Sequence, residues 1–238
     1  MSDDAKPAIT ITAFDWVPDF ARGQVRDLRV RWALEEVGQP YTVRYLSQGA
    51  QKAPPHRARQ PFGQVPTFEQ GDLTLFESGA IVFHIAERFG GLLPGDPGAR
   101  ARAVEWMFAA LNTVEPPITD HAIATLFEAG EPWSRPRLPA VEARIAERLG
   151  ELADRLGDSP WLDGDSFTAG DLLMVAVLRI IQDSEMLAAH PTLTAYVKRG
   201  TARPAFGRAL DAQVQGFTGA PPPEFAAWLE QHQQGANP

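Results

Sequence analysis

The feature that most constrains the fold is a change of hydrophobic pattern before the middle of the chain. Up to Leu93, short alternating apolar segments typical of strands are mixed with segments of helical spacing. After the Pro- and Gly-rich run at residues 94–98, strand patterns cease and helical spacing continues alone. The sequence therefore predicts an α/β domain at residues 1–93, a linker at 94–98 and an all-helical domain at 99–238. Its tail, residues 219–238, is rich in Pro, Gln and Gly, and we expect it to be loosely ordered.

The first domain is predicted to run strand, helix, strand, loop, hairpin, helix. The expected strands are 9–14, 41–45, 65–68 and 73–76, and the last two flank the turn signal Gln-Gly-Asp at 70–72. Two helical faces, at 30–37 and 81–89, end at Gly38 and Gly90. Between Leu46 and Pro61, the pair Pro54-Pro55 predicts an absence of regular structure.

Three segments of the second domain keep helical spacing, at 141–156, 172–180 and 193–197. Thr168 is followed three residues later by Asp171, which is the pattern of a capping box at the start of the middle segment. That helix is apolar almost all round, so we expect it to be buried. We therefore predict that Asp171 is structural and that replacing it lowers stability.

Composition excludes several classes of function. The chain has 22 basic and 30 acidic residues, a net charge of −8, which disfavours a general nucleic-acid partner. It has no cysteine, which removes disulfides, thiolate metal sites and a cysteine nucleophile. The five histidines lack metal-ligand spacing, so no metal is expected. No long apolar run or signal peptide is visible, and we expect a cytoplasmic protein without a membrane partner.

The most informative stretch runs from Gln51 to Gly90. A cis bond between Val65 and Pro66 would turn the backbone N–H and carbonyl of Val65 out of the sheet, toward an extended peptide. Ser78 follows a strand and precedes a helix, so we expect it to be the N-cap of that helix. The free N–H groups of a first helical turn attract anions.

These motifs resemble the cytosolic glutathione S-transferase family, of bacterial type. The matching residues are Pro61–Pro66, Glu77-Ser78, the segment from Trp161 to Asp171, and Arg203–Phe206; the resemblance covers about residues 8–212. It implies a thioredoxin-like N-terminal domain (βαβ-ββα) followed by an all-α helical bundle. It also implies a homodimer that takes glutathione as co-substrate.

The resemblance further implies a set of glutathione-binding residues. Val65 would hold the cysteinyl part through its backbone, with Pro66 cis. Glu77 would pair with the α-amine, and Ser78 with its helix N-terminus would take the α-carboxylate. Gln51 and Lys52 match the positions that bind the glycine carboxylate, and Gln64 matches another contact position; a loop lysine exposed to solvent remains the alternative for Lys52.

The chain departs from the family where a Tyr, Ser or Cys usually activates the thiol. Residues 13–27 contain no such side chain and no Thr. Gln24 aligns with the hydroxyl position, and its amide could donate a hydrogen bond to a thiolate, as could the indole of Trp16 or a backbone N–H at the helix start. Arg22 or Arg26 could lower the thiol pKa through charge. Packing for Trp16 and a solvent-exposed helix face for the arginines are the alternatives, and the catalytic residue stays unassigned.

The function predicted from the resemblance is conjugation of the glutathione thiolate to small hydrophobic electrophiles, a detoxifying reaction. The electrophile site is expected between the domains, with Trp106, Met107, Phe108, Asn112, Glu115 and Pro116 as candidates. Because the usual hydroxyl is missing, two alternatives stay open: a glutathione-binding scaffold or sensor without catalysis, and a glutathione-dependent peroxidase or reductase.

Overall fold

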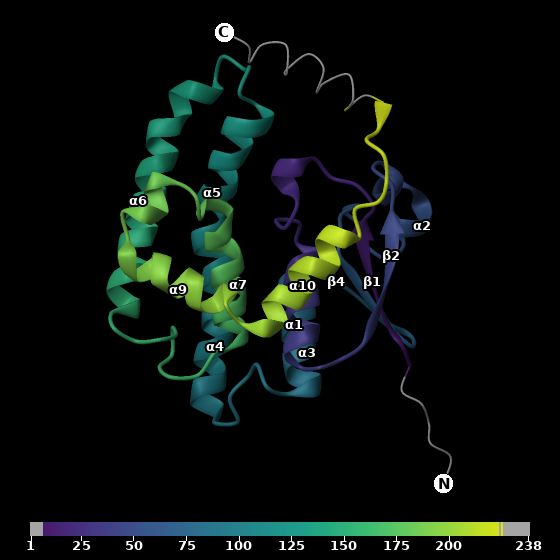
Figure 1. The fold of residues 1–238 in the computed structure, drawn as a ribbon, viewed down its shortest axis with the longest axis horizontal. Coiled ribbons are helices and arrows are strands. Elements are labelled where there is room, and N and C mark those ends of the chain that lie inside the picture. Colours follow the sequence, from purple (N-terminus) through teal and green to yellow (C-terminus); the bar gives the residue numbers. More distant parts are fainter. Residues whose placement is uncertain (1–6, 224, 226–238) are drawn as a thin grey trace.

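The computed structural model describes residues 7–223 and 225, and its first half builds a four-stranded mixed sheet covered by helices (Figure 1). The elements of this half are β1 (Ile9–Phe14), η1 (Asp19–Ala21), α1 (Asp27–Glu36), β2 (Tyr41–Leu46), η2 (Ala50–Lys52), α2 (Pro54–Arg57), β3 (Thr67–Gln70), β4 (Leu73–Phe76) and α3 (Ser78–Phe89). The strand order is β2-β1-β3-β4, with β1 parallel to β2 and antiparallel to β3.

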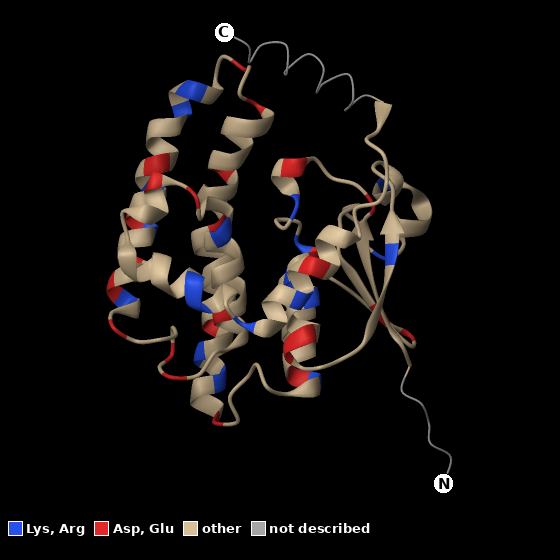
Figure 2. Cartoon of the chain, in the orientation of Figure 1, with Lys and Arg blue, Asp and Glu red and all other residues tan. Residues whose placement is uncertain are grey.

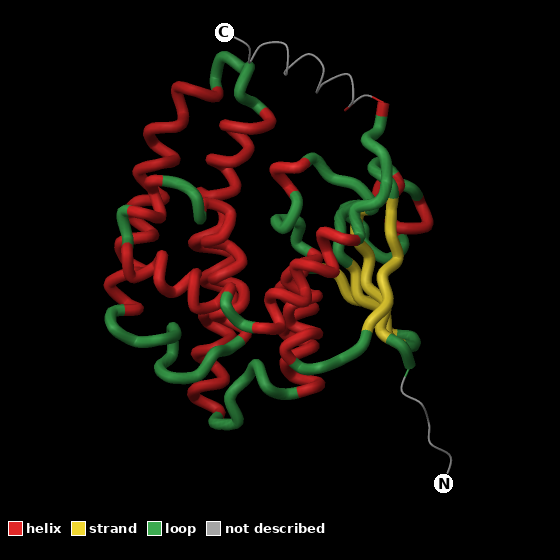
Figure 3. The backbone as a smooth tube through the Cα atoms, in the orientation of Figure 1, coloured by secondary structure: helices red, strands yellow, loops and turns green. Residues whose placement is uncertain are grey.

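The second half is helical throughout its described residues (Figure 3). Its elements are α4 (Pro97–Ala109), η3 (Ala110–Val114), α5 (Glu115–Ala122), η4 (Ile123–Phe127), α6 (Ser134–Leu156), α7 (Ala169–Leu178), η5 (Arg179–Ile181), α8 (Glu185–Ala188), α9 (Pro191–Thr201) and α10 (Pro204–Gln215). The segments η3 and η4 are π-helical. The predicted fold class, an α/β half followed by an all-helical half, is confirmed.

Helix α7 is the centre of the second half, and all ten of its residues are buried. The predicted capping box is present: the Asp171 carboxylate accepts from the Thr168 backbone N–H and hydroxyl, both at 2.9 Å. The same carboxylate accepts from Leu162 N at 2.9 Å and from Tyr196 Oη at 2.9 Å. One buried carboxylate thus ties together the start of α7, the preceding loop and α9.

One continuous apolar core joins the two halves. It runs from Ile9 in β1 to Ala209 in α10, and α1 lies against α10 and α7. Trp32 of α1 is fully buried and packs edge-on against Phe206 of α10, with ring centroids 5.0 Å apart. Beside it, Arg203 forms a bidentate ion pair with Glu36, at 2.6 and 2.7 Å. Helix α10 therefore completes the packing of the first half.

Three local expectations need correction. Pro54-Pro55 does not prevent regular structure, because the two prolines occupy the first turn of α2, where the missing N–H has no helical partner. Strand β3 begins only at Thr67, after the proline that cannot donate to the ladder. The predicted linker is shorter than 94–98: Asp96 caps α4 by accepting from Ala99 N at 2.8 Å, and Pro97 and Gly98 belong to the helix.

The described part of the predicted loose tail, residues 219–223 and 225, returns to the first domain. Gly219 N donates to the Asp15 carbonyl at 2.8 Å, and Phe225 packs edge-on against Trp16 at 5.1 Å. The rest of the tail lies outside the described residues. Within the described part of the chain, no helix has both the length and the apolar character needed to cross a bilayer.

Candidate functional site

A cavity of about 760 Å³ lies between the two halves and brings together most of the residues singled out in the sequence. Its floor on the first half comes from the end of β1, the start of α1 and the loop before β3. Its other wall comes from α5, η4 and η5. A neighbouring cavity of about 470 Å³ shares Arg26, Arg29, Gln64, Val65 and Glu115 with it and extends to the start of α3. The two form one cleft.

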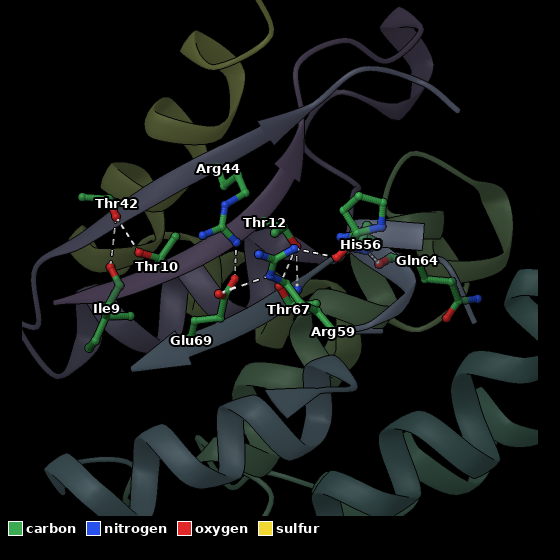
Figure 4. Close-up of polar contacts among 11 residues, drawn as sticks. Ile9, Thr10, Thr12, Thr42, Arg44, His56, Arg59, Gln64, Thr67 and Glu69 are labelled. Carbon is green, nitrogen blue, oxygen red and sulfur yellow. Dashed lines mark hydrogen bonds and ion pairs between the residues drawn. The ribbon is translucent and has the colours of Figure 1, made fainter. Parts of the chain in front are cut away.

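The loop before β3 presents unpaired backbone groups to this cleft. The Val65–Pro66 bond is cis, as predicted, and neither the N–H nor the carbonyl of Val65 has a hydrogen-bond partner among the described residues. The loop is held from both sides: His56 Nε2 donates to the Gln64 carbonyl at 2.6 Å, and Thr67 N donates to Thr12 Oγ1 at 2.7 Å (Figure 4). The free backbone of Val65 is therefore placed on a rigid support.

The start of α3 differs from the prediction in one residue. Glu77, not Ser78, is the N-cap, and Ser78 is the first helical residue with no capping bond from either side chain. Glu77 has φ of 68°, the only positive φ among the described residues other than glycine. This strained backbone directs an exposed carboxylate to the rim of the cleft beside the N-terminus of α3. A carboxylate and a free helix N-terminus, which prefers anions, thus lie next to each other.

A buried ion-pair cluster joins the halves beneath this rim. Glu115 of α5 accepts from Arg29 at 2.8 and 3.1 Å and from Arg26 at 2.8 and 3.1 Å. Burial raises the pKa of Glu115, but the guanidinium groups of Arg29 and Arg26 outweigh it and hold that pKa below its usual value. Arg29 also donates to Ser78 Oγ at 3.4 Å. The cluster therefore links α1, α5 and the start of α3.

Charged residues give the larger cavity a positive balance. Its lining contains four basic residues, Arg26, Arg29, Lys52 and Arg179, and two acidic residues, Glu115 and Asp183. The net charge of the whole chain is −8. Acidic and basic positions are interspersed over both halves (Figure 2), and the larger cavity has a charge balance opposite in sign to that of the whole chain. Such a lining attracts an anionic ligand.

The far side of the cavity is apolar. On that side, Phe20 of η1 and Phe127 of η4 pack edge-on against each other, with ring centroids 6.0 Å apart. Phe20 is 43% exposed and Phe127 is 66% exposed. Leu126, Ile180 and Met186 continue this wall. Sequence reasoning missed these residues, because only the folded chain brings η1, η4 and η5 together.

The four candidates for thiol activation divide into two groups. Gln24 and Arg26 line the cavity. Trp16 does not: it is buried, its carbonyl accepts from Gln48 at 2.9 Å, and its ring contacts Phe225. Arg22 is also outside the lining and pairs with Asp19 at 3.2 Å.

The glutathione-binding candidates all line the cleft, although Lys52 Nζ donates to the Phe62 carbonyl at 3.1 Å. The electrophile-site candidates do not stay together. Glu115 lines both cavities, whereas Asn112 and Pro116 reach only the smaller one. Met107 and Phe108 line another, apolar cavity between α3 and α4, which shares Glu77, Leu111 and Asn112 with the smaller one. Trp106 lies against α7, because a Cβ added at Gly170 would be only 2.6 Å from the Cβ of Trp106.

Arg179 is the other residue that sequence reasoning missed. It directly follows the buried helix α7 and lines the cavity. Its Nη1 donates to the Gly23 carbonyl at 2.9 Å, and its own carbonyl accepts from Gln24 Nε2 at 3.4 Å. A single arginine at the end of an otherwise apolar helical run was the available signal.

Comparison with known proteins agrees with this architecture. Residues 20–87 match the family model described as glutathione S-transferase, N-terminal domain, and residues 115–204 match the model of the C-terminal domain. The chain is 30% identical over 229 residues to glutathione S-transferase 4 of Zea mays, covering 91% of this chain and 98% of that protein. It is 32% identical over 182 residues to a glutathione S-transferase of Hyoscyamus muticus, covering 70% and 82%.

Among solved structures, one similar protein is the theta class glutathione S-transferase of Xanthomonas axonopodis pv. citri with glutathione bound. The sequence identity is 28% and the TM-score 0.71, over 87% of this chain and 99% of that one. Both halves of the chain and the cleft between them are covered by these similarities.

Proposed function

The chain belongs to the glutathione S-transferase family, and we propose that it catalyses addition of the glutathione thiolate to small hydrophobic electrophiles in the cleft between its halves. The observation that carries this proposal is the cleft itself. One cavity holds a basic side with free backbone groups for a peptide, and an apolar side with two aromatic rings that pack against each other. A peptide thiol and an apolar reaction partner could thus be held side by side.

Glutathione fits the basic side by its charges. It carries two carboxylates, one ammonium group and a thiol. The carboxylate of Glu77 would pair with the ammonium group, and Ser78 with the N–H groups at the α3 N-terminus would donate to the neighbouring carboxylate. The free backbone of Val65 would hold the cysteinyl part, while Gln51 and Lys52 would meet the glycine carboxylate at the other end.

The electrophile would lie against Phe20, Phe127 and Met186. The glutathione sulfur, after releasing its proton to solvent, attacks the electrophilic carbon; an S–C bond forms and the leaving group departs with the bonding electrons. Gln24 lines the cavity at the position that usually carries a hydroxyl, and its amide could donate to the sulfur. The protein supplies proximity and a lowered thiol pKa, and both accelerate such a reaction.

We also propose that the protein is a homodimer. Phe108 is 62% exposed and lines an apolar cavity of about 500 Å³ with Phe83 and Leu111. On the first half, Phe62 is equally exposed at 62% and packs edge-on against Phe76. A second copy with its Phe62 side against the α3–α4 cavity would cover both surfaces. Phe108→Glu should then convert a dimer into a monomer in sedimentation velocity, whereas an unchanged oligomeric state would exclude this interface.

We further propose that the protein acts in the bacterial cytoplasm and has a detoxifying role. Both proposals rest on the resemblance to the glutathione S-transferase family. The deciding experiment is a binding titration with glutathione, followed by turnover of an activated aryl halide and of an organic hydroperoxide. Turnover of the halide with saturable glutathione binding supports the transferase. Binding without turnover of either substrate would favour a scaffold, and turnover of the hydroperoxide alone would favour a peroxidase. Absence of binding would refute the proposal.

A further inference from the structure

Arg179 is a buried cation whose charge is not neutralised by an ion pair within the described residues. It is 6% exposed, and its guanidinium makes one hydrogen bond to the described residues, from Nη1 to the Gly23 carbonyl at 2.9 Å. Its guanidinium carbon lies 4.7 Å from the centre of the Phe206 ring. The other deeply buried arginines differ, because Arg29 pairs with Glu115 and Arg31 with Asp27, at 2.8 and 2.7 Å.

Burying a guanidinium without a carboxylate is costly. Burial lowers the pKa of Arg179 to about 10, against a weaker opposing effect of Asp183. A charge kept at this cost, on the lining of a cavity, indicates that the cavity receives an anion. Arg179 contacts residues 23–24, which lead directly into α1 at the floor of the cavity. The anion that would lie nearest to these residues is the thiolate of bound glutathione.

We propose that Arg179 is a positioning residue for thiol activation in a site without a hydroxyl. Its hydrogen bonds fix the Gly23-Gln24 turn, and its positive charge stabilises the glutathione thiolate. This inference rests on the proposed transferase function. Ionisation leaves the electron pair on sulfur and releases the thiol proton to solvent. An unneutralised cation behind the turn favours that state over the neutral thiol.

The turn is suited to transmit this effect. Gly23 has φ of 79°, and a Cβ there would lie 3.0 Å from Leu210, so the backbone packs closely against α10. The side chain of Arg179 holds the Gly23 carbonyl from this side. Its own carbonyl accepts one N–H of the Gln24 amide at 3.4 Å, which orients the amide; the second N–H has no hydrogen-bond partner among the described residues.

The test is the pKa of the thiol of bound glutathione, measured by ultraviolet difference absorption against pH. Arg179→Gln removes the charge but keeps a donor for the Gly23 carbonyl, and Arg179→Lys restores the charge. Arg199→Met is the matched control: Arg199 also donates to a carbonyl, that of Pro160 at 2.7 Å, and lies over an aromatic ring, that of Trp161, but outside the cleft. S-methylglutathione, which has no thiol, reports binding separately.

In the wild type and in Arg199→Met, we expect the pKa of the bound thiol to be lower than the free value of about 8.5 by about one pH unit or more. Arg179→Gln should raise it by about one, with the pH profile of kcat/KM moving by the same amount. Arg179→Lys should recover at least half of the difference. The affinity for S-methylglutathione should stay within about threefold in all variants, because Arg179 acts on the sulfur.

An unchanged thiol pKa in Arg179→Gln, with S-methylglutathione still bound, would overturn the inference. So would a wild-type thiol pKa equal to that of free glutathione. If the wild type binds no S-methylglutathione, it is the proposed function that fails instead. Should Arg179→Gln lack a cooperative thermal transition, Arg179→Met replaces it as the neutral variant and is held to the same expectation.

Discussion

Glu115 provides the sharpest test of how the two halves are held together. It is 6% exposed and accepts four hydrogen bonds from Arg26 and Arg29. Glu115→Gln keeps the shape but leaves Arg29, only 5% exposed, as a buried charge without a carboxylate. Removing one partner of a buried ion pair costs about 3–5 kcal/mol. Arg26 adds little because its side chain is 46% exposed and water screens its charge.

We therefore expect Glu115→Gln to lower the free energy of unfolding by about 3 kcal/mol, or the melting temperature by about 6–12 °C for a chain of this size. Urea denaturation at pH 7 measures the first quantity and calorimetry the second. Glu151→Gln is the matched control, because Glu151 also pairs with an arginine, Arg148 at 2.5 Å, but is 57% exposed. It should cost less than about 0.5 kcal/mol.

The pH dependence follows from the lowered pKa of Glu115. A carboxylate with a depressed pKa in the folded state stabilises the protein above its unfolded value of about 4.3, and this contribution is lost as the pH falls through the folded value. The difference between the wild type and Glu115→Gln should thus be constant from pH 6 to 7 and shrink below about pH 4. A difference under about 1 kcal/mol, or one that does not change with pH, would refute this reasoning.

Three further predictions concern the cap of α7 and the two sides of the cleft. Asp171→Ala should lower the free energy of unfolding by about 3 kcal/mol, since the α7 cap and the bonds to Leu162 and Tyr196 are lost together; a loss below 1 kcal/mol in urea denaturation would contradict the structural role. Glu77→Gln should weaken glutathione binding about 10- to 100-fold in calorimetry, because it removes a charged partner. The melting temperature should not change, because Glu77 is exposed. An unchanged Kd would place the glutathione ammonium group elsewhere. Phe127→Ala should raise KM for an apolar electrophile about 3- to 10-fold and leave KM for glutathione unchanged, and a rise in the glutathione KM instead would assign this ring to the peptide side.

Much of the first half could be predicted from local sequence. β1 and β4 have the expected bounds because period-two alternation and a glycine turn act within a few residues. The N-cap of α3 was predicted at Ser78, one position too late, because Glu77 adopts a positive φ that propensity does not anticipate. Pro54-Pro55 misled because proline has opposite effects in the first turn and in the interior of a helix.

The cleft was harder to predict, because its second wall depends on tertiary packing. The candidates on α4 and α5 were predicted to line one site, but the π-helical segment Ala110–Val114 shifts the phase between Phe108 and Glu115. Phe20 and Phe127 lie 107 positions apart in the chain and meet only after both halves fold. Arg179 was detectable as the first charge after a long apolar run, but its contact with Gly23 was not.

The packing of α10 against α1 has a consequence for synthesis of the chain. Glu36 and Trp32 leave the ribosome early, while their partners Arg203 and Phe206 emerge more than 160 residues later. At 5–20 residues per second this delay is of the order of 10 s. During that interval the nascent α/β half exposes the face of α1 that α10 will cover. Its earliest synthesised helix is therefore among the last to be fully enclosed, and this face is where a chaperone would find apolar surface to bind.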